Sequence, residues 1–119
     1  MRDIKFRVYR HFPKEEILYF TIDDLIYLKQ PVQVIQEFQG VKDTLMQYTG
    51  LKDKKGKEIY EGDIVNDGDL NFEVYRHNSG EWKAGWCSLW EYISDNEIEN
   101  CWEIVGNIYE NPEILENNL

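Results

Sequence analysis

Short stretches in which apolar and polar residues alternate recur along this chain of 119 residues, and clusters of turn-forming residues separate them. The first stretch places Ile4, Phe6 and Val8 on one side of an extended chain, a period of two that predicts a half-buried β-strand. A continuous apolar run at residues 17–20 predicts a second strand. Further strands are predicted at residues 32–38, 44–48, 71–75, 81–86 and 102–109, the last with a bulge or bend at Gly106.

Two short helices are expected in the second half of the chain. Ser88 and Glu91 have the spacing of a capping box, which predicts a helix of one or two turns at residues 89–93. The Asn-Pro pair at 111–112 has the composition of a helix start and predicts a final short helix. Residues 23–31 fit either a capped helical turn or a short strand, and the pattern does not choose between them.

Short strands separated by short turns are typical of a mainly β protein. Tight turns are expected at residues 66–69 and 77–80, where glycine follows polar residues. A chain of this size removes roughly two thirds of its extended surface from water, which is enough for one hydrophobic core. We therefore predict a single domain over residues 1–119, built as a small barrel or strongly bent antiparallel sheet with one or two short helices in its C-terminal half.

The chain is organised around residues 48–65, two apolar half-strands on either side of a charged turn. In this turn, Asp53 can accept hydrogen bonds from the backbone two residues further on, and Gly56 accepts the positive φ that ends it. The Gly-Asp pair at 62–63 predicts a second sharp bend. The lysine-rich tip is expected to be solvated and to matter little for stability. The alternative is a binding loop in which Lys54 and Lys55 contact a partner.

Residues 48–65, YTGLKDKKGKEIYEGDIV, closely resemble the signature of the YopX-like proteins of bacteriophages and prophages. The start of the chain, MRDIKFR at residues 1–7, and its end, EIVGNIYENPE at residues 103–113, agree with the same family. The resemblance implies a mostly β fold, encoded by a phage or an integrated prophage, with no established activity. Residues 8–11 depart from the Ala-Trp-Asp-like turn expected of the family, so the first hairpin is expected to differ in detail.

The net charge of −10 is unevenly distributed along the chain. Residues 1–60 carry eleven Lys and Arg against nine Asp and Glu, a net charge of +2, whereas residues 61–119 carry two against fourteen, a net charge of −12. A surface of the latter sign repels phosphates, so direct binding of nucleic acid is disfavoured. The two halves are complementary in charge, which favours association between copies of the chain.

The compartment is predicted from what the sequence lacks. No apolar run approaches the roughly 18 residues that span a bilayer, and the N-terminus lacks the pattern of a secretory signal. The two cysteines, Cys87 and Cys101, are expected to be reduced thiols in apolar surroundings. We therefore expect a cytoplasmic protein of the bacterial host cell that does not contact the membrane.

No group of residues has the spacing of a catalytic or metal site. The two histidines and two cysteines lack the local pairing that zinc sites use, and no serine lies in a nucleophile elbow. We expect no enzyme activity and no cofactor. The sequence does not decide whether Glu61, Asp63, Asp67 and Asp69 bind a cation. It also does not decide whether the repeated F-x-V-Y-R-H pattern brings Arg10, His11, Arg76 and His77 together.

Four tryptophans lie within residues 82–102, and core packing explains them most simply. The functional alternative is an aromatic patch for association, with Trp82, Trp86 and Trp90 as candidate contacts and Trp82 and Trp86 on one face of a strand.

We therefore expect a non-enzymatic phage accessory protein that acts by protein association, first with itself and otherwise with a host or phage protein. The alternative is an acidic protein that imitates DNA and occupies a host nucleic-acid-binding protein. That alternative requires an exposed acidic face, formed by Glu61, Asp63, Asp67, Asp69, Glu97, Glu99 and Glu103.

Overall fold

A computed structural model describes residues 4–10, 14–21, 44–89 and 102–116 of the chain. The chain divides into two compact units, residues 1–48 and 49–119, and each is described by itself. The strand predicted at 32–38 and the ambiguous segment 23–31 lie outside the described residues. A single domain over the whole chain stays a prediction.

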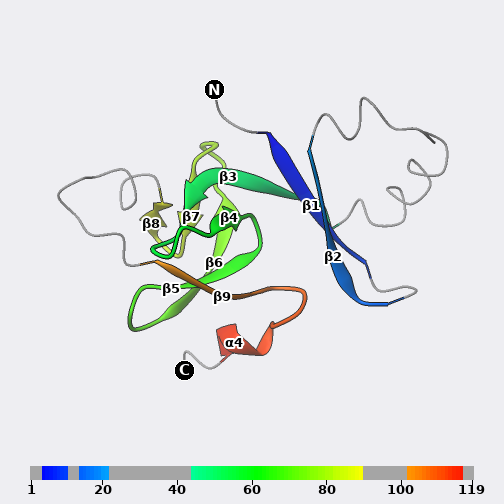
Figure 1. The fold of residues 1–119 in the computed structure, drawn as a ribbon. Helices are drawn as coiled ribbons and strands as arrows, with labels where there is room; N and C mark the ends of the chain where they lie inside the picture. The colour runs from blue at the N-terminus through cyan, green and yellow to red at the C-terminus, as the bar shows by residue number, and fades with distance from the viewer. Residues whose placement is uncertain (1–3, 11–13, 22–43, 90–101, 117–119) are drawn as a thin grey trace. The chain divides into compact units, whose positions relative to one another are not determined.

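The first unit contains an antiparallel hairpin and the start of a third strand (Figure 1). Strand β1 (Lys5–Arg10) lies between β2 (Glu16–Thr21) and the first residues of β3 (Met46–Lys52), which confirms the first two predicted strands. The expected alternation of burial along β1 is wrong, because Arg7, Val8 and Tyr9 are all buried whereas Ile4 is 49% exposed. Consecutive side chains of a strand point to opposite faces, so both faces of β1 are covered along Arg7 to Tyr9.

Polar groups of β1 form hydrogen bonds with residues at the start of β3 and just before it. Arg7 Nε donates to the sulfur of Met46 at 3.4 Å. The backbone of Tyr9 is bonded at both its N–H and its C=O to the hydroxyl of Thr44, at 2.9 and 2.8 Å. A buried arginine on this strand is therefore compatible with the rule that buried polar groups are hydrogen-bonded.

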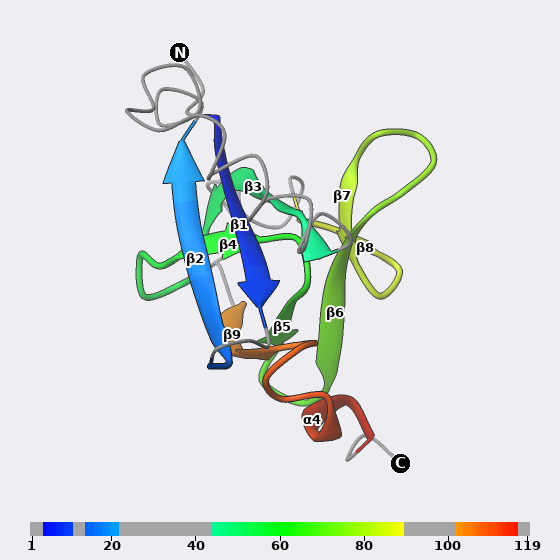
Figure 2. The same ribbon diagram turned by 90° about the vertical axis from the view of Figure 1, so that its right-hand side faces the viewer.

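The second unit begins within β3, which pairs with β4 (Glu58–Tyr60). A five-stranded antiparallel sheet follows, in the order β8-β7-β6-β5-β9 (Figures 1 and 2). Its strands are β5 (Asp63–Asn66), β6 (Asn71–Arg76), β7 (Trp82–Ala84), β8 (Cys87–Ser88) and β9 (Glu103–Asn107). The helix α4 (Glu113–Glu116) follows β9 and packs against β6.

A bulge interrupts the pairing of β5 with β9 in this sheet. The pairing of β5 with β9 shifts between Ile64, opposite Gly106, and Val65, opposite Ile104, which leaves Val105 as an extra residue on β9. At the bulge, a Cβ on Gly106 would lie 2.7 Å from Asn111 Oδ1, so a side chain at this position would displace that of Asn111. The predicted bulge at Gly106 is therefore confirmed.

The core of the second unit lies between β3–β4 and the five-stranded sheet. It consists of the buried residues Leu51, Ile59, Val65, Val74, Ala84, Leu89 and Trp102. The mainly β fold with a strongly bent antiparallel sheet is confirmed, and α4 is the short helix of the C-terminal half that the structure describes. Of the helix predicted at 89–93, only Leu89 is described. Among the described residues, no helix is long and apolar enough to cross a membrane.

Candidate interaction site

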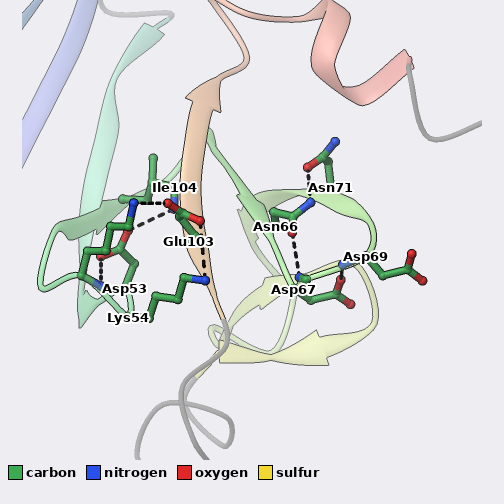
Figure 3. Close-up of polar contacts among 10 residues, drawn as sticks. Asp53, Lys54, Asn66, Asp67, Asp69, Asn71, Glu103 and Ile104 are labelled. Atoms are coloured by element: carbon green, nitrogen blue, oxygen red, sulfur yellow. Dashed lines mark hydrogen bonds and ion pairs between the residues drawn. The ribbon is translucent and has the colours of Figure 1, made fainter.

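The lysine-rich turn between β3 and β4 is built around the buried carboxylate of Asp53, which is 5% exposed (Figure 3). Its Oδ1 accepts hydrogen bonds from the backbone N–H of Lys55 at 3.0 Å and of Lys57 at 2.8 Å. Gly56 has a φ of +83°, and its N–H donates to the carbonyl of Asp53 at 2.9 Å. The predicted turn chemistry is confirmed.

The same turn is also docked on the beginning of β9, a contact that the sequence does not reveal. Asp53 Oδ2 accepts from the N–H of Ile104 at 3.0 Å. One residue further on, the N–H of Lys54 donates to the carbonyl of Trp102 at 2.8 Å. The turn is therefore bonded to β9, although Asp53 and Ile104 lie 51 residues apart in the sequence.

Both candidate lysines of the tip pair with Glu103, which lies between these two docking residues. Lys55 Nζ lies 2.6 Å from Glu103 Oε1, and Lys54 Nζ lies 3.6 Å from Oε2. The hydrogen bond and charge of Lys55 lower the pKa of the Glu103 carboxyl, with a smaller contribution from Lys54. Glu103 in turn raises the pKa of Lys55. The lysines are exposed as predicted, but their charge is partly neutralised within the protein.

Replacing Lys55 with Ala is expected to raise the pKa of Glu103 toward its ordinary value, and replacing Lys54 with Ala is expected to raise it less. The stabilisation from this pair is present above the ordinary pKa of a glutamate and is lost as the pH falls through the lowered pKa of Glu103. Because the pair is exposed, neither substitution should change the melting temperature appreciably. NMR titration of the Glu103 carboxyl measures the effect, and an equal shift in the two variants would contradict the assignment of Lys55 as the main partner.

Trp86 stands at the tip of the turn between β7 and β8 and is 96% exposed. Because Ala84 pairs with Cys87, the turn has two residues, Gly85 and Trp86. Gly85 has a φ of +62°, and a Cβ there would lie 2.6 Å from the ring of Phe72. The hydroxyl of Tyr75 donates to the carbonyl of Gly85 at 2.9 Å, which also holds the turn in place. The fold thus displays this indole on a fixed backbone.

Trp82 has a different environment from Trp86. It lies on β7, is partly buried against the core, and carries the guanidinium of Arg76 over its ring at 5.8 Å from the ring centroid. The prediction that Trp82 and Trp86 share one face of a strand at 81–86 is therefore wrong, because β7 ends at Ala84 and the chain turns. Trp90 lies outside the described residues. Trp102, which is 1% exposed, belongs to the core.

The acidic residues of the 61–69 region mainly build turns. Asp63 is 2% exposed and its Oδ2 accepts from the N–H of Tyr60 at 2.8 Å. Asp67 Oδ1 accepts from the N–H groups of Asp69 and Leu70, at 2.9 and 2.8 Å (Figure 3). Among the described residues, no group of three or more acidic, histidine or cysteine side chains is arranged to hold a metal ion.

The structure describes only part of the predicted acidic face and only part of the two Arg-His pairs. Glu97, Glu99 and His11 lie outside the described residues, and Arg10 belongs to the first unit, where it pairs with Glu16. His77 is exposed at the β6–β7 loop, and its Nδ1 lies 3.0 Å from the hydroxyl of Ser79. The same hydroxyl donates to Glu81 at 3.5 Å, so these three side chains form a local network of the loop.

Comparison with known proteins identifies a family and similar solved structures. A profile of the family described as "YopX protein" matches residues 5–116 of the chain. The crystal structure of protein EF1440 from Enterococcus faecalis is similar with a TM-score of 0.51 and 27% sequence identity. The similarity covers 92% of this chain and 74% of that one. No curated protein matches.

Proposed function

The chain belongs to the YopX family. We propose that it is a phage- or prophage-encoded accessory protein that acts by protein association, first with copies of itself. In this proposal it works in the cytoplasm of the host cell, without enzyme activity and without a cofactor. The observation that carries the proposal is the exposure of Trp86 on a rigid turn.

An indole that is 96% exposed leaves a large apolar surface in water. Tryptophan is enriched among the few residues that dominate binding energy at protein interfaces. The glycine and tyrosine contacts of the turn hold its backbone before binding, which reduces the entropy that association costs. This combination supports a role of Trp86 as an anchor for another protein surface.

The charge distribution supports association between copies. The chain carries +2 over residues 1–60 and −12 over residues 61–119, so two copies can bring opposite charges together. The imitation of DNA is the less favoured alternative, because two residues of its required acidic face do not supply free exposed charge. Asp63 is buried, and Glu103 is paired with two lysines.

Replacing Trp86 with Ala is expected to abolish self-association while leaving the fold intact, because the side chain makes little contact with its own chain. Sedimentation velocity at low salt over a range of protein concentrations measures this. The comparison variant is the double substitution of Lys54 and Lys55 by Ala, which removes the net +2 of residues 1–60 and should weaken association without abolishing it. If instead the lysine variant lost association and the Trp86→Ala variant kept it, the β3–β4 turn would be the binding loop.

A further inference from the structure

The β6–β7 hairpin presents different surfaces at its two ends. Val74 pairs with Ala84 and Arg76 with Trp82, so the turn that carries Trp86 lies at the Phe72 end of β6. The loop of residues 77–81 lies at the other end of β6, as Figure 2 shows. Four residues of an extended strand separate the two ends, about 13 Å.

The end that carries Trp86 is acidic and apolar. The β5–β6 turn lies at the same end, because it leads directly into Asn71 at the start of β6. That turn presents the exposed residues Asp69 and Leu70, with Leu70 41% exposed, beside the partly exposed Asp67. This end therefore combines an exposed indole with carboxylates.

The opposite end carries an arginine stacked on an aromatic ring, together with one exposed carboxylate, Glu81. Arg76 is exposed and its guanidinium rests over the ring of Trp82. His77 follows it and is exposed as well. Arg76 and Lys83 are the only Lys or Arg residues in positions 61–119, and both belong to this hairpin. A planar guanidinium can stack on a second aromatic ring from its open side.

We infer that copies of the chain associate head to tail, with Trp86 of one copy stacked on Arg76 of the next, on the side away from Trp82. This rests on the proposed function and specifies its partner and its geometry. The carboxylates beside Trp86 then face the end of the neighbouring copy that carries Arg76. A symmetric contact of Trp86 with Trp86 would instead bring two acidic turns together, which like-charge repulsion opposes.

Such a contact is heterologous, because it joins two different surfaces: the end that carries Trp86 in one copy and the end that carries Arg76 in the next. Heterologous contacts produce rings or open chains, whereas symmetric contacts produce closed dimers. The average mass of the wild-type protein should therefore increase beyond twice the 14.3 kDa of one chain as its concentration rises. High salt should reduce this growth, since charge complementarity contributes to it.

A mixing experiment with Trp86→Ala and Arg76→Gln tests this geometry. Each variant alone lacks one half of the contact and should sediment as a monomer. Mixed in equal amounts, they should form a one-to-one pair and nothing larger, because only the Trp86 of one and the Arg76 of the other remain. Lys83→Gln removes the other cation of the hairpin and is the matched control, which should associate like the wild type.

The outcomes separate this inference from the proposed function. Wild-type protein that associates while the mixture stays monomeric would overturn the head-to-tail contact and leave self-association standing. Association of Arg76→Gln alone would likewise overturn it in favour of a symmetric contact. Wild-type protein that is monomeric at every concentration and salt would overturn the proposed self-association and this inference together. Circular dichroism of each variant confirms that it is folded before mixing.

Discussion

Replacing Asp53 with Ala is expected to lower the free energy of unfolding by about 2–4 kcal/mol. The buried carboxylate accepts three backbone N–H groups, from Lys55, Lys57 and Ile104. Without it, the turn loses two partly buried hydrogen bonds and the beginning of β9 loses one, and a donor left unsatisfied away from water costs free energy. Denaturant unfolding followed by circular dichroism measures the change.

Asp67 supplies a matched control, because its Oδ1 also accepts two N–H groups of its own turn, at 2.9 and 2.8 Å. That turn is solvated and no bond from Asp67 to a distant strand is among those described, so Asp67→Ala should cost about 1 kcal/mol or less.

Asp53→Asn separates the role of Asp53 within the turn from its bond to β9. An amide can keep the turn bonds through its oxygen, but its NH₂ group then meets the N–H of Ile104. If Asp53→Asn were as stable as the wild type, the link to β9 would contribute little.

The turns of this protein were predicted correctly because a turn depends on a few consecutive residues. Gly56, Gly62, Gly68 and Gly80 all have positive φ, as their positions after polar residues indicate. The docking of the β3–β4 turn on β9 could not be predicted in the same way. Its two sides are 51 residues apart, and one carboxylate among many gives no sign of which distant N–H it accepts from.

The candidate site shows a similar limit. Alternation predicted that Trp82 and Trp86 share a face, but a glycine between them ends the strand and turns the chain. Gly85 was the available signal, since glycine before an aromatic residue fits a two-residue hairpin turn. Exposure is a property of the whole fold, so the sequence alone could not distinguish the buried Trp102 from the exposed Trp86. The family, by contrast, was recognisable from short motifs, and the profile match over residues 5–116 confirms it.

Replacing Gly62 with Val is expected to destabilise the protein by about 2–4 kcal/mol. Gly62 is buried and has a φ of +85°, a region that a β-branched residue adopts only at a considerable cost. Its backbone also joins three strands of the second unit. Gly62 lies immediately before β5 begins. Its N–H donates to the carbonyl of Val74 on β6 at 2.9 Å, and its carbonyl accepts from the N–H of Ile108, just after β9, also at 2.9 Å. Relaxing the strain by changing φ would therefore break hydrogen bonds on both sides.

Gly56 provides the control for this substitution, because its φ of +83° is nearly the same. It is exposed, and nothing lies within 4 Å of where its Cβ would stand. Gly56→Val therefore reports the backbone strain alone, whereas Gly62→Val adds the loss of the bonds to Val74 and Ile108 if the chain relaxes. Thermal and denaturant unfolding of both variants should show the larger loss at Gly62. Equal losses would mean that the bend before β5 contributes only its unusual φ, and that the strands it joins are held together by their other contacts.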